Sequence, residues 1–318
     1  MKKNILYALS LMTIVGAGLT SCTTEDALSP ASVVVSDKTE ENDFDRWLEA
    51  NYVAPYNIDF HYRYSDAEGH MNYYMVPSRI EDAIKLAHIV KYLCLETYDQ
   101  MVGVQFTRQN FPKMIYPTGT WEFKNNGTYI LGTAEGGKKI YLMGTHYLDD
   151  IMNGRGYGQG YTVAGGLNHY YIKTIHHEFT HILNQTKDYS PEFEQITTKT
   201  YVNDGWSEPP YNVGYLGRGF ISAYAQDEDR EDFAEMVSLY ITNTPEQWEE
   251  WMQEAAQTAN SEYDNKTGRE LIEAKLDIVR AYMSEQWGID IDQMRDEIQK
   301  RQNDVAEGKI DLTDLTVD

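Results

Sequence analysis

The sequence predicts an α+β fold, with a small antiparallel sheet and one central helix in an upper lobe and a helical lower lobe. Apolar residues recur at helical spacing through residues 78–101, which predicts one long amphipathic helix. Residues 111–147 instead alternate around an Asn-Gly step at 126–127, which is typical of antiparallel strands and a hairpin. Helical spacing returns from residue 168 and dominates the rest of the chain.

Local start and stop signals bound the helices of the second half. Thr244 and Gln247 have the spacing of a capping box ahead of an amphipathic segment, and Gly268 begins another long periodic run. The sequence therefore predicts helices at residues 229–242, after residue 244, at 268–287 and at 290–306, the last of them exposed.

The N-terminus has the features of an export signal. Residues 1–21 combine two lysines with an apolar run too short for a membrane span, and Leu-Thr-Ser-Cys at residues 19–22 resembles the lipobox of bacterial lipoproteins. Cys22 is therefore the predicted lipid attachment site, although an ordinary cleaved signal with a chance cysteine is the alternative. Residues 22–42 are mainly polar and are expected to be a flexible tether, which leaves residues 43–318 as the folded domain.

The mature chain is strongly acidic. Loss of Lys2 and Lys3 with the signal takes the formal charge from −23 to −25. Such a surface repels nucleic acid and anionic lipid, so we expect no nucleic-acid partner and membrane attachment only through the lipid on Cys22. Once Cys22 is lipidated, Cys94 is the one remaining cysteine, so the fold must hold without an internal disulfide.

A His-Glu-Phe-Thr-His sequence occupies residues 177–181 within a helical, uncharged segment. Residues four apart share one face of a helix, so His177 and His181 can hold the same metal ion. Glu178 is rotated by about 100° from His177, where its carboxylate can meet a water at the open position of the metal and act as general base. A chance match on an ordinary helix is the alternative, but the uncharged flanks favour a buried metal motif.

A catalytic zinc site usually has three protein ligands. Asn184 and Lys187 stand where a metzincin would have Gly and His, which excludes that class. Glu231 and Glu235 share one face of the predicted helix 229–242, so we predict that Glu231 binds the metal and that Glu235 hydrogen-bonds the ring nitrogen of a ligand histidine. An acidic face in solvent is the alternative, but apolar residues between and after the two carboxylates favour partial burial.

Tyr224 precedes this helix. A phenol near the metal can donate a hydrogen bond to the oxyanion of a tetrahedral intermediate, although packing is the alternative for any single tyrosine. The segment from Tyr-Ala-Gln at 224–226 to Glu-Asp-Phe-Ala-Glu at 231–235 resembles the third-ligand helix of the anthrax lethal factor group of gluzincin metallopeptidases. That resemblance implies that Tyr224 aids catalysis, that Glu231 binds zinc and that Glu235 supports a ligand.

A broader resemblance spans most of the mature chain. The lipobox and residues 173–183, 233–235 and 282–290 are similar to those of the zinc-binding metallopeptidase lipoproteins of Bacteroidetes, which accompany outer-membrane nutrient-import systems. The resemblance implies a zincin-like fold, a zinc cofactor and an outer-membrane import complex as a partner. It also implies a location in the cell envelope, anchored by lipid to the surface or periplasmic face of the outer membrane.

The expected activity is hydrolysis of peptide bonds in nutrient proteins or glycoproteins. Zinc is expected to supply Lewis acidity, Glu178 to pass a proton from water to the leaving amine, and Tyr224 to stabilise the oxyanion. Two alternatives share the same ligands: a zinc-containing binding component of the import system with little turnover, and a zinc hydrolase of a non-peptide amide or glycan substituent. Glu178 and Tyr224 favour catalysis, because a metal-binding module needs neither of them.

Overall fold

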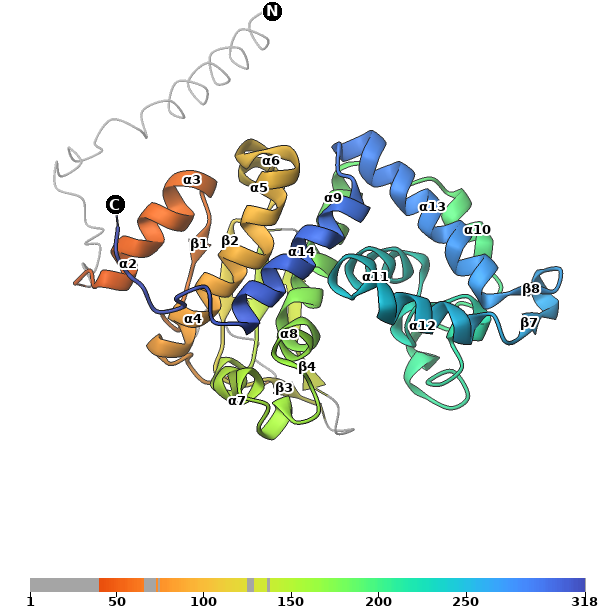
Figure 1. The fold of residues 1–318 in the computed structure, drawn as a ribbon, viewed down its shortest axis with the longest axis horizontal. Coiled ribbons are helices and arrows are strands. Elements are labelled where there is room, and N and C mark those ends of the chain that lie inside the picture. Colours follow the sequence, from red (N-terminus) through yellow and green to blue (C-terminus); the bar gives the residue numbers. More distant parts are fainter. Residues whose placement is uncertain (1–39, 66–72, 74, 125–128, 136–137, 318) are drawn as a thin grey trace, which may run out of the picture. The chain divides into compact units, whose positions relative to one another are not determined.

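The computed structural model describes residues 40–65, 73, 75–124, 129–135 and 138–317. Within it, Asn42–Asp318 form one compact unit, shown as a ribbon in Figure 1. The predicted signal peptide, Cys22 and the Asn-Gly turn lie outside the described residues. Among the described helices, none is long and apolar enough to cross a bilayer.

The N-terminal part of this unit is mainly helical, and apolar residues recur on one face of its longest helical run. Asn42 caps the first helix through a reciprocal capping box with Asp45. The predicted helix at 78–101 is confirmed as one helical run, with a π-helical turn at Lys91–Leu95, and it ends before Gly103, whose φ of 88° favours glycine. The helices of this part are α2 (Asp43–Leu48), α3 (Ala54–Tyr56), α4 (Ile80–Val90), α5 (Glu96–Val102) and α6 (Val104–Asn110).

The main sheet is mixed, which corrects the predicted antiparallel sheet. Its strand order is β1-β2-β6-β5, where β1, β2 and β6 run parallel and only β5 is antiparallel to its neighbour. Local alternation indicates a strand but not the direction of a distant partner, and a helical crossover separates the parallel pair β1 and β2. The strands are β1 (Asp59–Phe60), β2 (Met114–Pro117), β5 (Gly132–Glu135) and β6 (Lys139–Leu142).

The predicted hairpin strands on either side of the Asn-Gly step are confirmed. The strands β3 (Glu122–Phe123) and β4 (Tyr129–Ile130) pair antiparallel, and Glu122 lies opposite Ile130. This short ribbon precedes β5 directly in the chain. Strand β5 is in turn the edge strand of the main sheet that contacts the motif helix.

The helix that carries the motif is α9 (Lys173–Thr186), which follows α7 (Leu148–Met152), α8 (Val163–Leu167) and a π-helical turn at Asn168–Ile172. Helix α9 lies close to the edge strand β5 because residue 132 is a glycine. A Cβ atom there would be 2.6 Å from the Tyr141 carbonyl oxygen and 2.8 Å from Cγ2 of Thr174. The absence of a side chain therefore lets α9 approach the sheet edge.

The second half is helical, as predicted, and α11 packs against α9 in the centre of the unit. The predicted bounds 229–242 and 268–287 agree with α11 and α13. Helix α14 corrects the prediction of an exposed helix, because Met294 and Ile298 are fully buried and the helix packs on α11. The elements are α10 (Glu192–Thr197), α11 (Asp229–Thr242), α12 (Pro245–Ala255), α13 (Gly268–Trp287), α14 (Ile291–Ala306), β7 (Ala259–Asn260) and β8 (Lys266–Thr267). The predicted α+β class is confirmed.

Candidate metal centre

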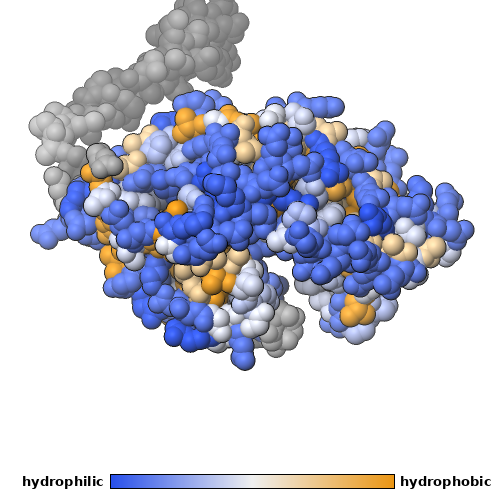
Figure 2. Space-filling model, viewed as in Figure 1, coloured by the Kyte–Doolittle hydropathy of each residue, from blue (hydrophilic) through white to orange (hydrophobic). Residues whose placement is uncertain are grey.

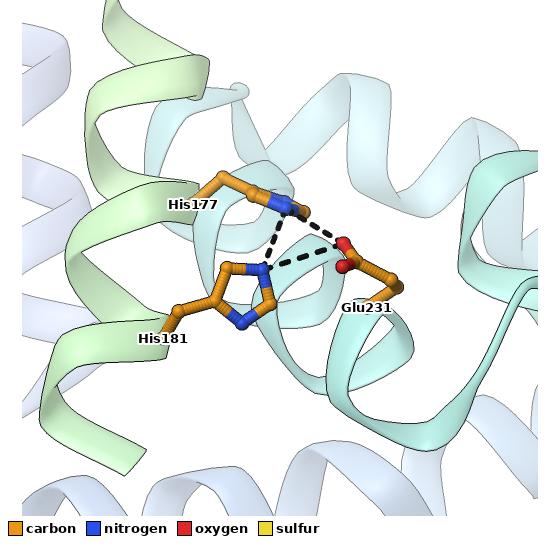
Figure 3. Close-up of side chains that lie close together, drawn as sticks. All are labelled: His177, His181 and Glu231. Carbon is orange, nitrogen blue, oxygen red and sulfur yellow. Dashed lines mark hydrogen bonds and ion pairs between the residues drawn. The ribbon is translucent and has the colours of Figure 1, made fainter. Parts of the chain in front are cut away.

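The two histidines of the motif project from one face of α9 towards α11 (Figure 3). Their Nε2 atoms are 3.1 Å apart, as expected for residues one helical turn apart whose rings converge. The His177 side chain is buried, whereas that of His181 is 18% exposed. The pair therefore presents two nitrogen donors, one on a buried ring and one on a partly exposed ring.

Glu231, in the first turn of α11, completes a set of three donors. Its Oε2 atom is 2.9 Å from Nε2 of His177 and 3.3 Å from Nε2 of His181. Donors held at 2.0–2.2 Å from one tetrahedral zinc ion lie roughly 3.3 Å from one another. The spacing and the chemistry of these three residues, two imidazole nitrogens and a carboxylate oxygen, thus fit a single zinc ion. No other such donor group is found among the described residues.

Glu235 lies where it can hold a ligand histidine in place. Its Oε1 atom is 2.7 Å from Nδ1 of His177, on the side of the ring opposite Glu231. Lys173 pairs with the same oxygen, and the hydroxyl of Ser222 donates to Oε2 over 2.8 Å. The Glu235 side chain is 2% exposed, so both of its oxygens contact protein groups and not solvent.

The carboxylates determine the protonation of this group. Burial opposes the charged forms, but hydrogen bonds from the two histidines hold the pKa of Glu231 well below its usual value. Burial likewise disfavours a charged His177, yet its bonds to Glu231 and Glu235 raise its pKa to about 9. A metal ligand must be the neutral imidazole, so zinc binding at neutral pH has to displace a proton from His177.

A cleft of about 610 Å³ opens beside these residues. One wall comes from the hairpin and β5, the floor from α9, and the other wall from the 3₁₀ turn Asn203–Ser207 together with Tyr224. Figure 2 shows the unit hollowed at its lower edge, between the region of β3 and β4 and the region below α12. Glu178 lines the floor of the cleft next to His177, so the predicted base and the donor group face the same space.

Tyr224 is brought to the same place by a 3₁₀ turn, Tyr224–Gln226, just before α11. Its ring centroid is 5.9 Å from that of His177. Burial, together with the neighbouring Glu231 carboxylate, raises the pKa of Tyr224 well above its usual value. The phenol therefore keeps its proton at neutral pH and can donate a hydrogen bond, and it lies near the Glu231 carboxylate in the lining of the cleft.

His176, which directly precedes the motif, is directed away from the donor group. Its Nδ1 atom is 2.9 Å from the hydroxyl of Tyr98, and the ring is fully buried. Burial lowers the pKa of His176 to about 3, so it is a neutral residue of the core. The structure thus separates the two adjacent histidines into a packing residue and a cleft residue.

Three residues of the site were not singled out by the sequence analysis. Lys173 and Ser222 contact Glu235, and Trp206 packs edge-on against Tyr224 with ring centroids 5.0 Å apart. The position of Lys173 near the site could have been predicted from the sequence, because it stands four residues before His177 on the same face of α9. The positions of Ser222 and Trp206 could not have been predicted in this way, since these residues lie in irregular segments whose contacts depend on the fold.

A family model described as "Putative zinc-binding metallo-peptidase" matches residues 37–292 of the 318. The chain belongs to this family. A crystal structure described as "a putative zinc-binding metallo-peptidase from Bacteroides caccae" shares 35% sequence identity with it, and the match covers 90% of this chain and 100% of the other with a TM-score of 0.70. No curated protein gives a significant match.

Membership of this family confirms three predictions made from the sequence. The family and the Bacteroides caccae protein are described as zinc-binding metallopeptidases, in agreement with the predicted resemblance and with zinc as the cofactor. The likeness of the two structures also agrees with the α+β zincin-like fold. At the level of enzyme class, the chain is a member of a metallopeptidase family.

Proposed function

We propose that this protein is a gluzincin-type zinc metallopeptidase that hydrolyses peptide bonds of nutrient proteins or glycoproteins. One observation carries the proposal: the His177, His181 and Glu231 donors lie within 3.3 Å of one another, and His177 lines a cleft together with Glu178 and Tyr224. These three residues would hold the zinc. Zinc supplies Lewis acidity there, which polarises a carbonyl and lowers the pKa of a water.

The protein's own groups provide the proton transfers. The Glu178 carboxylate takes a proton from the attacking water and passes it to the nitrogen of the leaving amine. The Tyr224 hydroxyl donates a hydrogen bond to the oxygen that becomes negatively charged. The Glu235 carboxylate, 2.7 Å from Nδ1 of His177, would keep Nε2 of that ring directed at the donor group.

The edge strand favours a peptide over a non-peptide amide. Strand β5 is the last strand of its sheet among the described residues, and Leu131, Gly132 and Thr133 line the cleft. An extended polypeptide can add to such an edge through main-chain hydrogen bonds. A small amide or a glycan substituent would leave that edge unused.

The first expected result tests the proposal as a whole. The purified mature domain should carry one zinc per chain, and a chelator should abolish its cleavage of a mixed protein and glycoprotein digest. Metal analysis and mass spectrometry of the digest measure the two properties, and added zinc should restore cleavage. Full zinc occupancy without cleavage of any substrate would instead favour the binding component of an import system, and a chain unable to bind zinc would end the proposal.

We further propose that the protein is anchored by lipid on Cys22 to the outer membrane, at its surface or periplasmic face, where an import complex would be its partner. The support is the lipobox at residues 19–22 and the polar segment after it. The predicted division into residues 1–21, 22–42 and 43–318 stays a prediction. The strongly acidic domain would itself have little affinity for anionic lipid.

Replacement of Cys22 by serine should prevent lipidation. The variant is expected to remain unprocessed or to lose its lipid anchor, because the serine hydroxyl does not replace the acylated thiol. Extraction with and without detergent, together with the mass of the mature N-terminus, measures this. The anchor proposal fails if the wild-type protein extracts as freely as the variant and carries no lipid mass.

Tyr224→Phe should retain zinc but lower the rate of hydrolysis. Loss of one oxyanion donor typically costs roughly 2–4 kcal/mol of transition-state stabilisation, whereas the ring and its packing against Trp206 are kept. The expected result is a lower kcat with little change in KM, measured by steady-state kinetics on a peptide substrate. Tyr215→Phe is a matched control, because Tyr215 lies outside the cleft. An unchanged kcat would assign Tyr224 to packing.

A further inference from the structure

Ser222 lies at a junction between the proposed metal site and the turn that carries Tyr224. Its hydroxyl donates to Oε2 of Glu235 over 2.8 Å and accepts a hydrogen bond from the Ala225 amide over 3.0 Å. Ala225 is the residue after Tyr224 in the 3₁₀ turn. One hydroxyl therefore connects a carboxylate on α11 with the backbone of that turn.

The carboxylate in this connection also contacts His177. Oε1 of Glu235 lies 2.7 Å from Nδ1 of His177 as an ion-pair contact, and Oε2 accepts a hydrogen bond from Ser222. Lys173 pairs with Oε1 and balances the buried negative charge. A shift of the His177 ring would thus change the position of the Glu235 carboxylate. Through Ser222, it would also change the hydrogen bond of the Ala225 amide.

Apart from the Tyr224 phenol, which lies near the Glu231 carboxylate, the other anchors of the turn reach residues 202–218. The Gln226 carbonyl accepts from the amide of Val202 over 2.8 Å, and its side chain binds Tyr211 and Arg218 over 2.8 and 2.7 Å. These contacts hold the turn to the segment that contains Trp206. Ser222 is the contact that links the same turn to the residue supporting His177.

We propose that Ser222 is a positioning residue that couples occupancy of the metal site to the placement of Tyr224. A zinc ion at Nε2 would fix the position of the His177 ring, and with it the contact between Nδ1 and Oε1 of Glu235. Glu235 is then held more firmly against the Ser222 hydroxyl, and the Ala225 amide is held with it. The coupling is reciprocal, so an ordered turn also favours metal binding.

This inference rests on the proposed function for the zinc site at His177 and for the role of Tyr224, and its main measurement needs no turnover. Hydrogen exchange at the Ala225 amide is followed by mass spectrometry in metal-free and zinc-loaded mature protein. Zinc should slow this exchange in the wild-type protein, by roughly fivefold if the gain equals one net hydrogen bond. Ser222→Ala should lose the zinc-dependent slowing at Ala225 and bind zinc roughly fivefold more weakly.

Two further variants separate positioning from a general loss of structure. Ser222→Thr keeps a hydroxyl and should restore both properties. Ser238→Ala removes a hydroxyl from the same helix, but that hydroxyl contacts the backbone oxygen of Glu235 and not its carboxylate, so zinc-dependent slowing should persist. Slowing that persists in Ser222→Ala, or that is absent from the wild-type protein while zinc is bound, would overturn the proposal. Either result is obtained whether or not the protein proves to be a peptidase.

Discussion

Glu231→Gln is expected to yield a folded protein that retains almost no zinc. The substitution leaves two histidines and replaces an anionic oxygen donor by a neutral amide, whereas zinc sites in proteins use at least three strong ligands. The carboxylate now lies 2.9 and 3.3 Å from the two Nε2 atoms, and no other described carboxylate completes a donor group with them. Zinc content after gel filtration, and competition with a chromogenic chelator, measure the loss.

Glu235→Gln is the matched comparison, since it makes the same chemical change one helical turn later. Glu235 contacts Nδ1 of His177 and is not itself one of the three metal donors. Zinc affinity should therefore fall by roughly 10- to 100-fold and not disappear. The variant leaves the charge of Lys173 unbalanced, so thermal unfolding with saturating zinc checks that the fold survives. If Glu235→Gln lost more zinc than Glu231→Gln, the two roles would be exchanged.

The placement of Glu231 and Glu235 on one buried helix face was predictable because it depends on local geometry. Two glutamates four residues apart share a helix face, and apolar neighbours such as Phe233 imply that the face is buried. The same local rules predicted the bounds of α11 and α13. The spacing of His177 and His181 likewise determines that both rings reach one point, whatever surrounds α9.

Features that depend on distant partners were not predictable in the same way. The parallel pairing of β1 with β2 joins segments separated by several helices, and strand alternation does not carry that information. The contacts of Ser222 and Lys173 with Glu235 bring together three separate segments. Helix α14 has a polar composition overall, and only its narrow apolar stripe, packed on α11, distinguishes it from an exposed helix.

Glu178→Gln is expected to lower hydrolysis by roughly 100- to 10,000-fold, the usual contribution of general acid–base catalysis. Glu178 lines the cleft floor next to His177 but is outside the three-donor group, so zinc content and thermal stability should stay at wild-type values. The amide is close in size to the carboxylate yet cannot accept the proton of the attacking water. Parallel measurements of kcat, zinc content and unfolding temperature separate loss of the base from loss of the metal.

The same variant distinguishes an enzyme from a zinc-containing binding protein. Because Glu178→Gln should still bind substrate in the cleft, it can retain uncleaved peptides from a mixed pool, which mass spectrometry then identifies. Glu194→Gln is a suitable control, since Glu194 is exposed on α10 and lies outside the cleft, and it should cleave as the wild-type protein does. A chelator-sensitive activity that survives unchanged in Glu178→Gln would show that another group takes the proton, and the proposed role of Glu178 would then be wrong.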